Sequence, residues 1–126
     1  LKDGEAPAND STTNSTDGMR RLISGILLYT NRNFRNIEEK EVAERFGISY
    51  SYFSRSFKRI MNMSFNEYIN FLKINEAQKI LLTENKSIAE ISRELSYATP
   101  SHFINVFRRF NNISPKQYKK AVFGKS

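Results

Sequence analysis

The sequence of 126 residues has no cysteine and only one histidine, His102. Without cysteine there can be no disulfide, no thiolate nucleophile and no cysteine-ligated zinc site, so the fold depends on packing alone. One histidine cannot supply a pair of metal ligands, and a histidine-dependent triad would have to be built around that single residue. We therefore expect neither an enzyme nor a bound cofactor or metal.

Long hydrophobic runs are also missing. The longest apolar stretches are far below the ~20 residues that span a bilayer, and no signal peptide is visible. A peripheral membrane protein would need an apolar face beside its basic residues, but Tyr118, Val122 and Phe123 are better explained by core packing and a fraying helix end. We expect a cytoplasmic, nucleoid-associated protein without a membrane partner.

Acidic residues are scarce in the second part of the chain, and none follows Glu94. The formal net charge is +7, but residues 1–18 hold one lysine and four acids. The remaining residues hold 19 bases and 9 acids, a net charge of +10. A basic excess concentrated on a few helices is typical of a protein with a polyanion partner, because each neutralised phosphate releases condensed counterions.

A duplicated segment organises the rest of the chain. Residues 53–68, FSRSFKRIMNMSFNEY, return fifty positions later as FINVFRRFNNISPKQY at 103–118. Upstream of this segment the spacing is forty-nine, so the second copy has one extra residue in its turn. Two copies indicate a duplicated supersecondary unit rather than a solenoid, which needs three or more repeats.

Each copy has the cap residues of two helices joined by a short turn. In the first copy Gly47 ends one helix, and Ser49 caps the next, which runs to about Met61. In the second copy Thr99 caps the corresponding helix, with a proline at its first position. Each copy is therefore predicted to form a helix-turn-helix unit.

The predicted fold class is all-α, with about seven helices. A first helix is expected from Asp17 to Asn33, and a long linker helix opens after Ser64. Asn62 and Asn112 stand where helices stop, and we expect both to adopt positive φ. The predicted organisation is a flexible polar tail or interdomain linker over 1–17 and one domain over 18–126, divided into a first helix-turn-helix subdomain (18–63), the linker helix (64–84) and a second subdomain (85–126).

A helix-turn-helix unit inserts its second helix into the DNA major groove. Phenylalanines at positions 53, 57, 103 and 107 are expected to point inward, which turns the opposite faces outward. Neither helix contains an acid, although an amphipathic helix with a merely solvated face would also fit. The predicted DNA contacts are Tyr50, Ser51, Ser54, Arg55, Lys58 and Arg59 in the first copy and Thr99, Ser101, His102, Asn105, Arg108 and Arg109 in the second.

Two of these residues are suited to reading bases. Arg55 can pair with guanine through two hydrogen bonds, and Asn105 with adenine. The basic residues later on the two helices are expected to hold phosphates, which set the register but carry no sequence information. His102 fits a phosphate or rim contact as well as a base contact.

From Ile37 to Lys120 the chain resembles the DNA-binding domain of the AraC family of bacterial transcription regulators. The resemblance rests on VAERFGISYSYFSRSFKRIMNMSFNEYI, on LKINEAQKILL followed by SIAEIS, and on FINVFRRFNNISPKQYKK. It implies two helix-turn-helix subdomains joined by a long helix that read two successive major grooves of double-stranded DNA. It also implies an activator rather than a repressor, a contact with RNA polymerase, and an upstream effector or dimerisation domain, which the start at Leu1 also suggests.

The departures from this family pattern are local. Ser96, Asn62 and Asn112 stand where glycine is common in the family, which suggests turn variants. Asn105 stands where arginine is common, which bears on the base that is read.

Three other classes fit the sequence less well. The first is an enzyme that acts on DNA. Family relatives that accept methyl groups do so through cysteine, which is absent here. A protein-interaction module built on helix pairs would bind with little dependence on salt. A nonspecific DNA-organising protein would share the charge but would lack a preferred sequence.

The basic excess predicts salt-sensitive binding to duplex DNA. If ~6 phosphates are neutralised, the logarithm of the binding constant should fall with the logarithm of the salt concentration at a slope of about −5. Titration of a labelled duplex at several salt concentrations measures this slope. A flat response would contradict DNA binding and favour the protein-interaction module.

Overall fold

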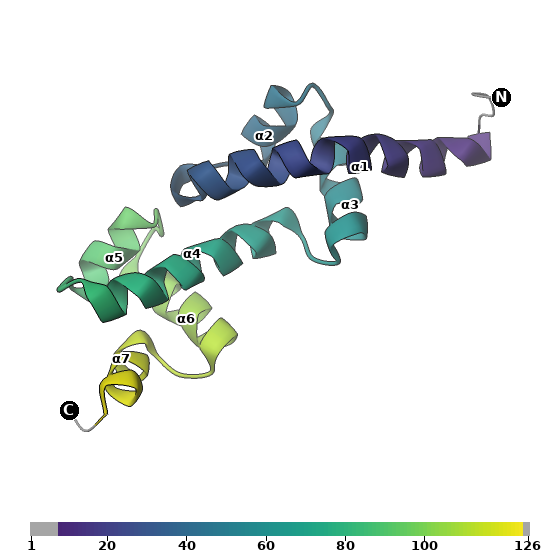
Figure 1. The fold of residues 1–126 in the computed structure, drawn as a ribbon. Coiled ribbons are helices and arrows are strands. Elements are labelled where there is room, and N and C mark those ends of the chain that lie inside the picture. The colour runs from purple at the N-terminus through teal and green to yellow at the C-terminus, as the bar shows by residue number, and fades with distance from the viewer. Residues whose placement is uncertain (1–7, 125–126) are drawn as a thin grey trace. The chain divides into compact units, whose positions relative to one another are not determined.

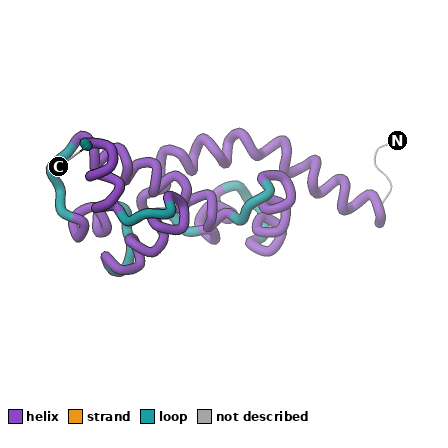
Figure 2. The backbone as a smooth tube through the Cα atoms, turned by 90° about the horizontal axis from the view of Figure 1, so that it is seen from below, coloured by secondary structure: helices purple, strands orange, loops and turns teal. Residues whose placement is uncertain are grey.

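The computed structural model describes the backbone of residues 8–124 and the side chains of residues 18–124. Over that range the chain forms α-helices joined by short loops, with no strand (Figures 1 and 2), so the all-α prediction is confirmed. The elements are α1 (Ala8–Asn33), the 3-10 helix η1 (Phe34–Asn36), α2 (Glu39–Arg45), α3 (Tyr50–Met61), α4 (Phe65–Thr83), α5 (Ile88–Glu94), α6 (Pro100–Asn111) and α7 (Pro115–Phe123).

The predicted helix ends are confirmed in both copies. Asn62 and Asn112 adopt positive φ, at 60° and 66°, and end α3 and α6. Gly47 also adopts positive φ, at 69°, in the turn between α2 and α3. In the second copy Ser96 adopts a φ of 63° in the corresponding turn, although a side chain there costs about 1–2 kcal/mol.

The start of α1 differs from the prediction. The helix begins at Ala8 rather than near Asp17, so residues 8–17, expected to be part of a flexible tail, have helical backbone. Once a helix is nucleated, each further residue adds one hydrogen bond, and polar residues lower helix propensity by less than about 1 kcal/mol each. Polar composition is therefore a weak signal for a helix end. The rest of the expected tail, residues 1–7, lies outside the described residues.

The described residues fall into two compact units. The first comprises the chain up to Asn33 together with 37–68, and the second comprises 34–36 together with the chain from Ile69 onward. The first four residues of α4 thus belong to the first unit and the rest of α4 to the second.

Each unit has its own aromatic core. In the first unit the ring of Phe65 lies 5.2 Å from that of Phe53 and 5.3 Å from that of Phe57, between ring centroids. In the second unit the ring centroids of Phe103 and Phe107 are 6.0 Å apart. All five side chains are at most 2% exposed. Burying such a side chain contributes about 1.5–3 kcal/mol, so these rings fix which face of α3 and of α6 turns inward.

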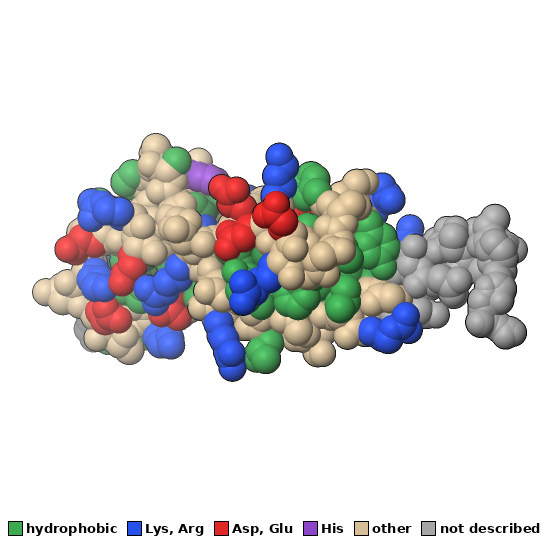
Figure 3. All heavy atoms as spheres, turned by 90° about the horizontal axis from the view of Figure 1, so that it is seen from above, with side chains coloured by type: hydrophobic (Ala, Val, Ile, Leu, Met, Phe, Trp, Pro, Cys, Tyr) green, Lys and Arg blue, Asp and Glu red, His purple; other side chains and the backbone are tan. Residues whose placement is uncertain are grey.

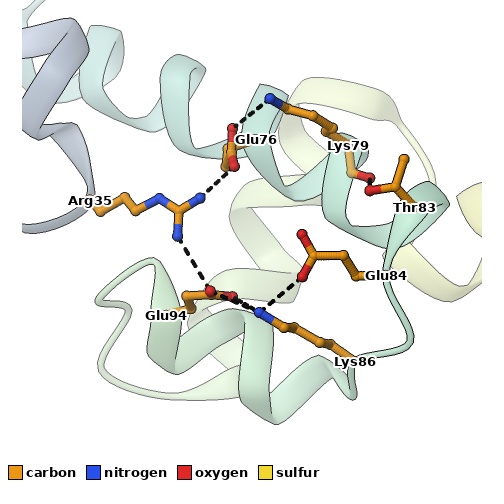
Figure 4. Close-up of polar contacts among 7 residues, drawn as sticks. All are labelled: Arg35, Glu76, Lys79, Thr83, Glu84, Lys86 and Glu94. Atoms are coloured by element: carbon orange, nitrogen blue, oxygen red, sulfur yellow. Dashed lines mark hydrogen bonds and ion pairs between the residues drawn. The ribbon is translucent and has the colours of Figure 1, made fainter.

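A cluster of charged side chains ties η1, α4 and α5 together in the second unit (Figure 4). The Arg35 guanidinium donates to Glu76 on α4 and lies 3.4 Å from a carboxylate oxygen of Glu94 on α5. The Lys86 ammonium lies 2.9 Å from Glu94 and 3.0 Å from Glu84. The Lys86 ammonium holds the pKa of Glu94 below its ordinary value, and Glu94 in turn raises the pKa of Lys86.

The lowered pKa of Glu94 predicts a contribution to stability that depends on pH. A carboxyl whose folded pKa is lowered stabilises the fold above its unfolded pKa, and this contribution is lost as pH falls through the folded pKa. Glu94→Gln should therefore lower the thermal unfolding temperature slightly at neutral pH, more at low salt, because partly exposed ion pairs are screened.

The difference between Glu94→Gln and the parent should disappear in acid. Thermal unfolding followed by circular dichroism from neutral to acidic pH measures this difference. The control is Glu44→Gln, which replaces an exposed glutamate of α2. A difference that persisted unchanged at the lowest pH would mean that Glu94 does not act through its charge.

Candidate nucleic-acid interface

The second helix of the first unit, α3, presents one buried and one exposed face. Ser49 begins it by accepting a hydrogen bond from the amide of Tyr52 at 3.1 Å. Phe53 and Phe57 are fully buried, as predicted. The predicted contact residues Ser51, Arg55, Lys58 and Arg59 are exposed on the opposite side. Tyr50 is exposed at the first position of the helix, and Ser54 is half-buried.

The corresponding helix of the second unit, α6, repeats this arrangement. Thr99 accepts a hydrogen bond from the amide of His102 at 3.0 Å, and Pro100 occupies the first turn. Phe103 and Phe107 are fully buried. All six predicted contact residues of this copy are exposed: Thr99, Ser101, His102, Asn105, Arg108 and Arg109.

Matching stripes run along the two exposed faces. Ser51, Arg55 and Lys58 are spaced i, i+4 and i+7 on α3, and Ser101, Asn105 and Arg108 have the same spacing on α6. Residues with this spacing lie on one face of a helix. The repeat therefore places three side chains at equivalent positions in each unit: a polar one, a candidate for contact with a nucleobase, and a basic one.

The side chain of Arg55 is held along its own helix. Its Nη1 donates to the hydroxyl of Ser51 at 2.7 Å, which draws the guanidinium toward the N-terminal turn of α3. The N-terminal residues of a recognition helix are those that approach base edges in helix-turn-helix proteins. Because a guanidinium has five N–H donors, this bond leaves donors for a ligand.

An acidic residue that the sequence reasoning missed adjoins this surface. Glu39, in the first turn of α2, accepts hydrogen bonds from the hydroxyls of Ser54 and Tyr50. Partial burial raises the pKa of the Glu39 carboxyl, and the two hydroxyls oppose that rise. In the free chain Ser54 and Tyr50 are therefore engaged with a carboxylate.

A signal for Glu39 was present in the repeat. At a spacing of forty-nine, Glu39 corresponds to Ile88, and at a spacing of fifty, Ser54 corresponds to Ile104. Ile88 and Ile104 are partly buried and pack against the core of the second unit. A polar pair in one copy and an apolar pair in the other is what a direct contact between the two positions would produce.

The basic residues at the ends of α3 and α6 are exposed. The Arg109 guanidinium lies 5.5 Å from the ring centroid of Phe110, which supports the long side chain near the end of α6. Figure 3 shows acidic side chains among the basic ones on one face of the molecule, whereas α3 and α6 contain no acid. The formal charge on these two helices is therefore entirely positive.

Two other features, a metal site and a membrane-spanning helix, are not found in the described part of the chain. Among residues 18–124, whose side chains are described, there is no group of three or more histidine, aspartate or glutamate side chains placed to hold a metal ion. Within the same range no helix combines the length and the apolar character needed to cross a membrane.

Known proteins similar to this chain share the same architecture. A family model described as a helix-turn-helix domain matches residues 42–121. A helix-turn-helix transcriptional regulator encoded in the cgkA 5′ region of Pseudoalteromonas carrageenovora is 33% identical over 100 residues, which are 79% of this chain and 59% of that protein. The chain thus spans about three fifths of the length of that relative.

Two solved structures show the same fold. A transcriptional regulator of Chromobacterium violaceum, described as containing an AraC-type DNA-binding domain, superimposes with a TM-score of 0.75 at 21% identity, over 87% of this chain and 99% of that one. The DNA-binding domain of the transcriptional factor AdpA, solved with a target DNA, superimposes with a TM-score of 0.72 at 20% identity, over 78% and 89% of the two chains.

The raised pKa of Glu39 predicts the effect of removing its charge. A carboxyl whose folded pKa is raised binds its proton more tightly in the folded state, so its ionisation costs stability as pH rises from the unfolded to the folded pKa. Glu39→Gln keeps an oxygen acceptor for the two hydroxyls but cannot ionise. Over that pH interval the parent should lose stability relative to the variant, which should be at least as stable as the parent at neutral pH.

Thermal unfolding of the parent and of Glu39→Gln from about pH 4 to about pH 7 tests this expectation. Glu44→Gln, on the same short helix, is the matched control. Equal pH dependence in the parent and in Glu39→Gln would show that this carboxyl does not titrate as its burial implies.

Proposed function

We propose that this chain, which belongs to the AraC-type family of helix-turn-helix domains, reads a specific sequence in double-stranded DNA by inserting α3 and α6 into successive major grooves. The relatives that this chain matches are described as transcriptional regulators and regulatory proteins. In this proposal the chain is the DNA-reading part of a bacterial transcription regulator.

One observation carries the proposal. In each of two helix-turn-helix units, the second helix buries its phenylalanines and exposes a stripe of polar and basic side chains with no acid on the helix. Such a helix fits the width of the major groove, and its positive charge is opposite to that of the DNA phosphates. A merely solvated helix has no physical reason to exclude acids, and here the exclusion occurs twice.

In this proposal α4, which contains residues of both units, is the connection between the two readers. This helix is unbroken over 19 residues, which correspond to about 28 Å at ~1.5 Å per residue. The major groove returns to the same side of a duplex after ~34 Å. We propose that the two readers enter grooves about one such repeat apart.

Arg55 and Asn105 are the proposed base readers. They occupy equivalent positions in the two stripes, and each lies one turn before an exposed basic side chain, Lys58 or Arg108. We assign guanine recognition to Arg55 and adenine recognition to Asn105. The remaining exposed basic residues, Arg59 and Arg109 among them, would bind phosphates and fix the register of the protein on the duplex.

The wider assignment follows from the family. The AdpA domain was solved with its target DNA, which supports duplex DNA as the ligand of this chain too. We further propose a role in activation rather than repression, in the cytoplasm, with a contact to RNA polymerase and with effector binding or dimerisation in another part of the protein.

Selection of preferred sites from a randomised duplex pool tests the proposed function. The parent should return two half-sites about one helical turn apart. Arg55→Ala should lower affinity for the preferred site by about 1–3 kcal/mol and relax the preference at one base pair of the first half-site. Asn105→Ala should do the same in the second half-site.

Lys58→Ala is the matched control, because it removes a charge from the same stripe as Arg55. It should weaken binding to every sequence alike and reduce the salt slope by about one. If Arg55→Ala and Asn105→Ala returned the parental motif at full strength, the assignment of base readers would be wrong. If the parent itself showed no preferred sequence, the chain would be a nonspecific DNA-binding protein.

A further inference from the structure

A series of side-chain contacts in the second unit connects buried residues of α4 with an exposed residue of α6. Asn70 and Lys73, on α4, are each 9% exposed, and Tyr97, in the turn before α6, is 7% exposed. His102, in the first turn of α6, is exposed. Tyr97 lies between the buried pair and the histidine.

Tyr97 is restrained at its hydroxyl and at its ring. The hydroxyl donates to Oδ1 of Asn70 at 2.8 Å, and Nζ of Lys73 lies 4.7 Å from the centre of the ring. The ring of Phe103 packs against it with centroids 5.6 Å apart. Burial raises the pKa of the Tyr97 phenol, so it remains protonated and keeps donating this hydrogen bond at neutral pH. A change of the Tyr97 χ1 rotamer would move the hydroxyl away from Asn70 and the ring away from Lys73.

His102 packs against this restrained ring. The two ring centroids are 5.2 Å apart and the ring planes are 85° apart, which is the edge-to-face geometry that aromatic pairs prefer. The backbone of His102 is held as well, because its amide donates to the hydroxyl of Thr99 at 3.0 Å. An exposed imidazole thus packs against a restrained ring at the end of α6 where a recognition helix approaches base edges.

The first copy lacks this arrangement. At the position of Tyr97 it has Ile48, which has neither a hydroxyl nor an aromatic ring, and at the position of His102 it has Tyr52. Both copies nevertheless form a complete helix-turn-helix unit. A helix-turn-helix unit can therefore form without the contacts of Asn70, Tyr97 and His102, and these contacts distinguish the second unit from the first.

We propose that Tyr97, restrained by Asn70 and Lys73, is a positioning residue that fixes the orientation of His102 for sequence reading in the second half-site. The inference rests on the proposed function, because it assigns to His102 a contact with a base edge rather than with a phosphate. A fixed imidazole loses less conformational freedom on binding and presents its ring nitrogens in one direction.

The contact itself can be tested without DNA. His102 is the only histidine in the chain, so its ring protons give one unambiguous set of signals in a proton–carbon correlation spectrum. The ring current of Tyr97 should displace these signals in the parent, and Tyr97→Ile should abolish the displacement. Tyr118→Phe is the matched control, because Tyr118 packs on Phe107 of the same core and should leave the signals unchanged. Unchanged signals in Tyr97→Ile would overturn the inference.

The role in reading is tested by site selection with a double-mutant design. Tyr97→Phe keeps the ring and the core volume and removes only the hydroxyl that binds Asn70, so it is the variant that retains the fold. Tyr97→Phe should weaken the base preference in the second half-site at the same positions as His102→Ala, and leave the first half-site unchanged. Tyr97→Ile should have a larger effect at those positions.

The double variant separates positioning from general packing. If Tyr97 acts through His102, then Tyr97→Phe combined with His102→Ala should give the profile of His102→Ala alone. A parental profile in Tyr97→Phe, an equal loss of affinity on all sequences, or a change that persists beside His102→Ala would each overturn the inference. A parent with no sequence preference would instead overturn the proposed function, which is a distinct result.

Discussion

The burial of two phenylalanines one turn apart on α3, and again on α6, is the constraint on which the rest of the structure depends. Phe53 and Phe57 in one unit and Phe103 and Phe107 in the other are fully buried. A helix can bury only one face against such a core, so the choice of that face also selects the side chains that remain in solvent. Rotating either helix would expose rings worth about 1.5–3 kcal/mol each and would misplace the polar stripe. Stability and the proposed function are therefore set by the same residues.

The two units share this constraint but differ in the contacts that surround it. The first unit places a carboxylate, Glu39, against the hydroxyls of α3, where the second has the apolar pair of Ile88 and Ile104. The second unit has Tyr97 against His102 of α6, where the first has Ile48. Both differences lie beside the exposed stripes and not among the buried phenylalanines. Under the proposed function, a duplicated unit that varies in this way would read two different half-sites, so the proposed target need not be a palindrome.

Local signals predicted most of the helix ends. Ser49, Thr99 and the residues at positive φ act through hydrogen bonds and dihedral angles within a few residues, and such effects are visible in a short stretch of sequence. The predicted start of α1 was wrong, because the polar composition of residues before Asp17 was taken to mean that they are not helical. A helix already anchored by buried residues such as Ile26 extends at small cost. The inward faces of α3 and α6 were predicted correctly, since their periodicity is strong.

The sequence by itself determined the all-α class, the duplication, the two amphipathic helices with acid-free exposed faces and the excess of positive charge, because each of these follows from residue type and spacing along a single segment. The tertiary structure alone decided that Glu39 engages Ser54 and Tyr50, that Arg35 reaches Glu76 and Glu94, and that Tyr97 joins Asn70 to His102. The residues of two of these hydrogen bonds are 27 and 41 positions apart. Helical periodicity relates residues three or four positions apart and contains no information on which distant side chains will meet, because that depends on how separate helices pack.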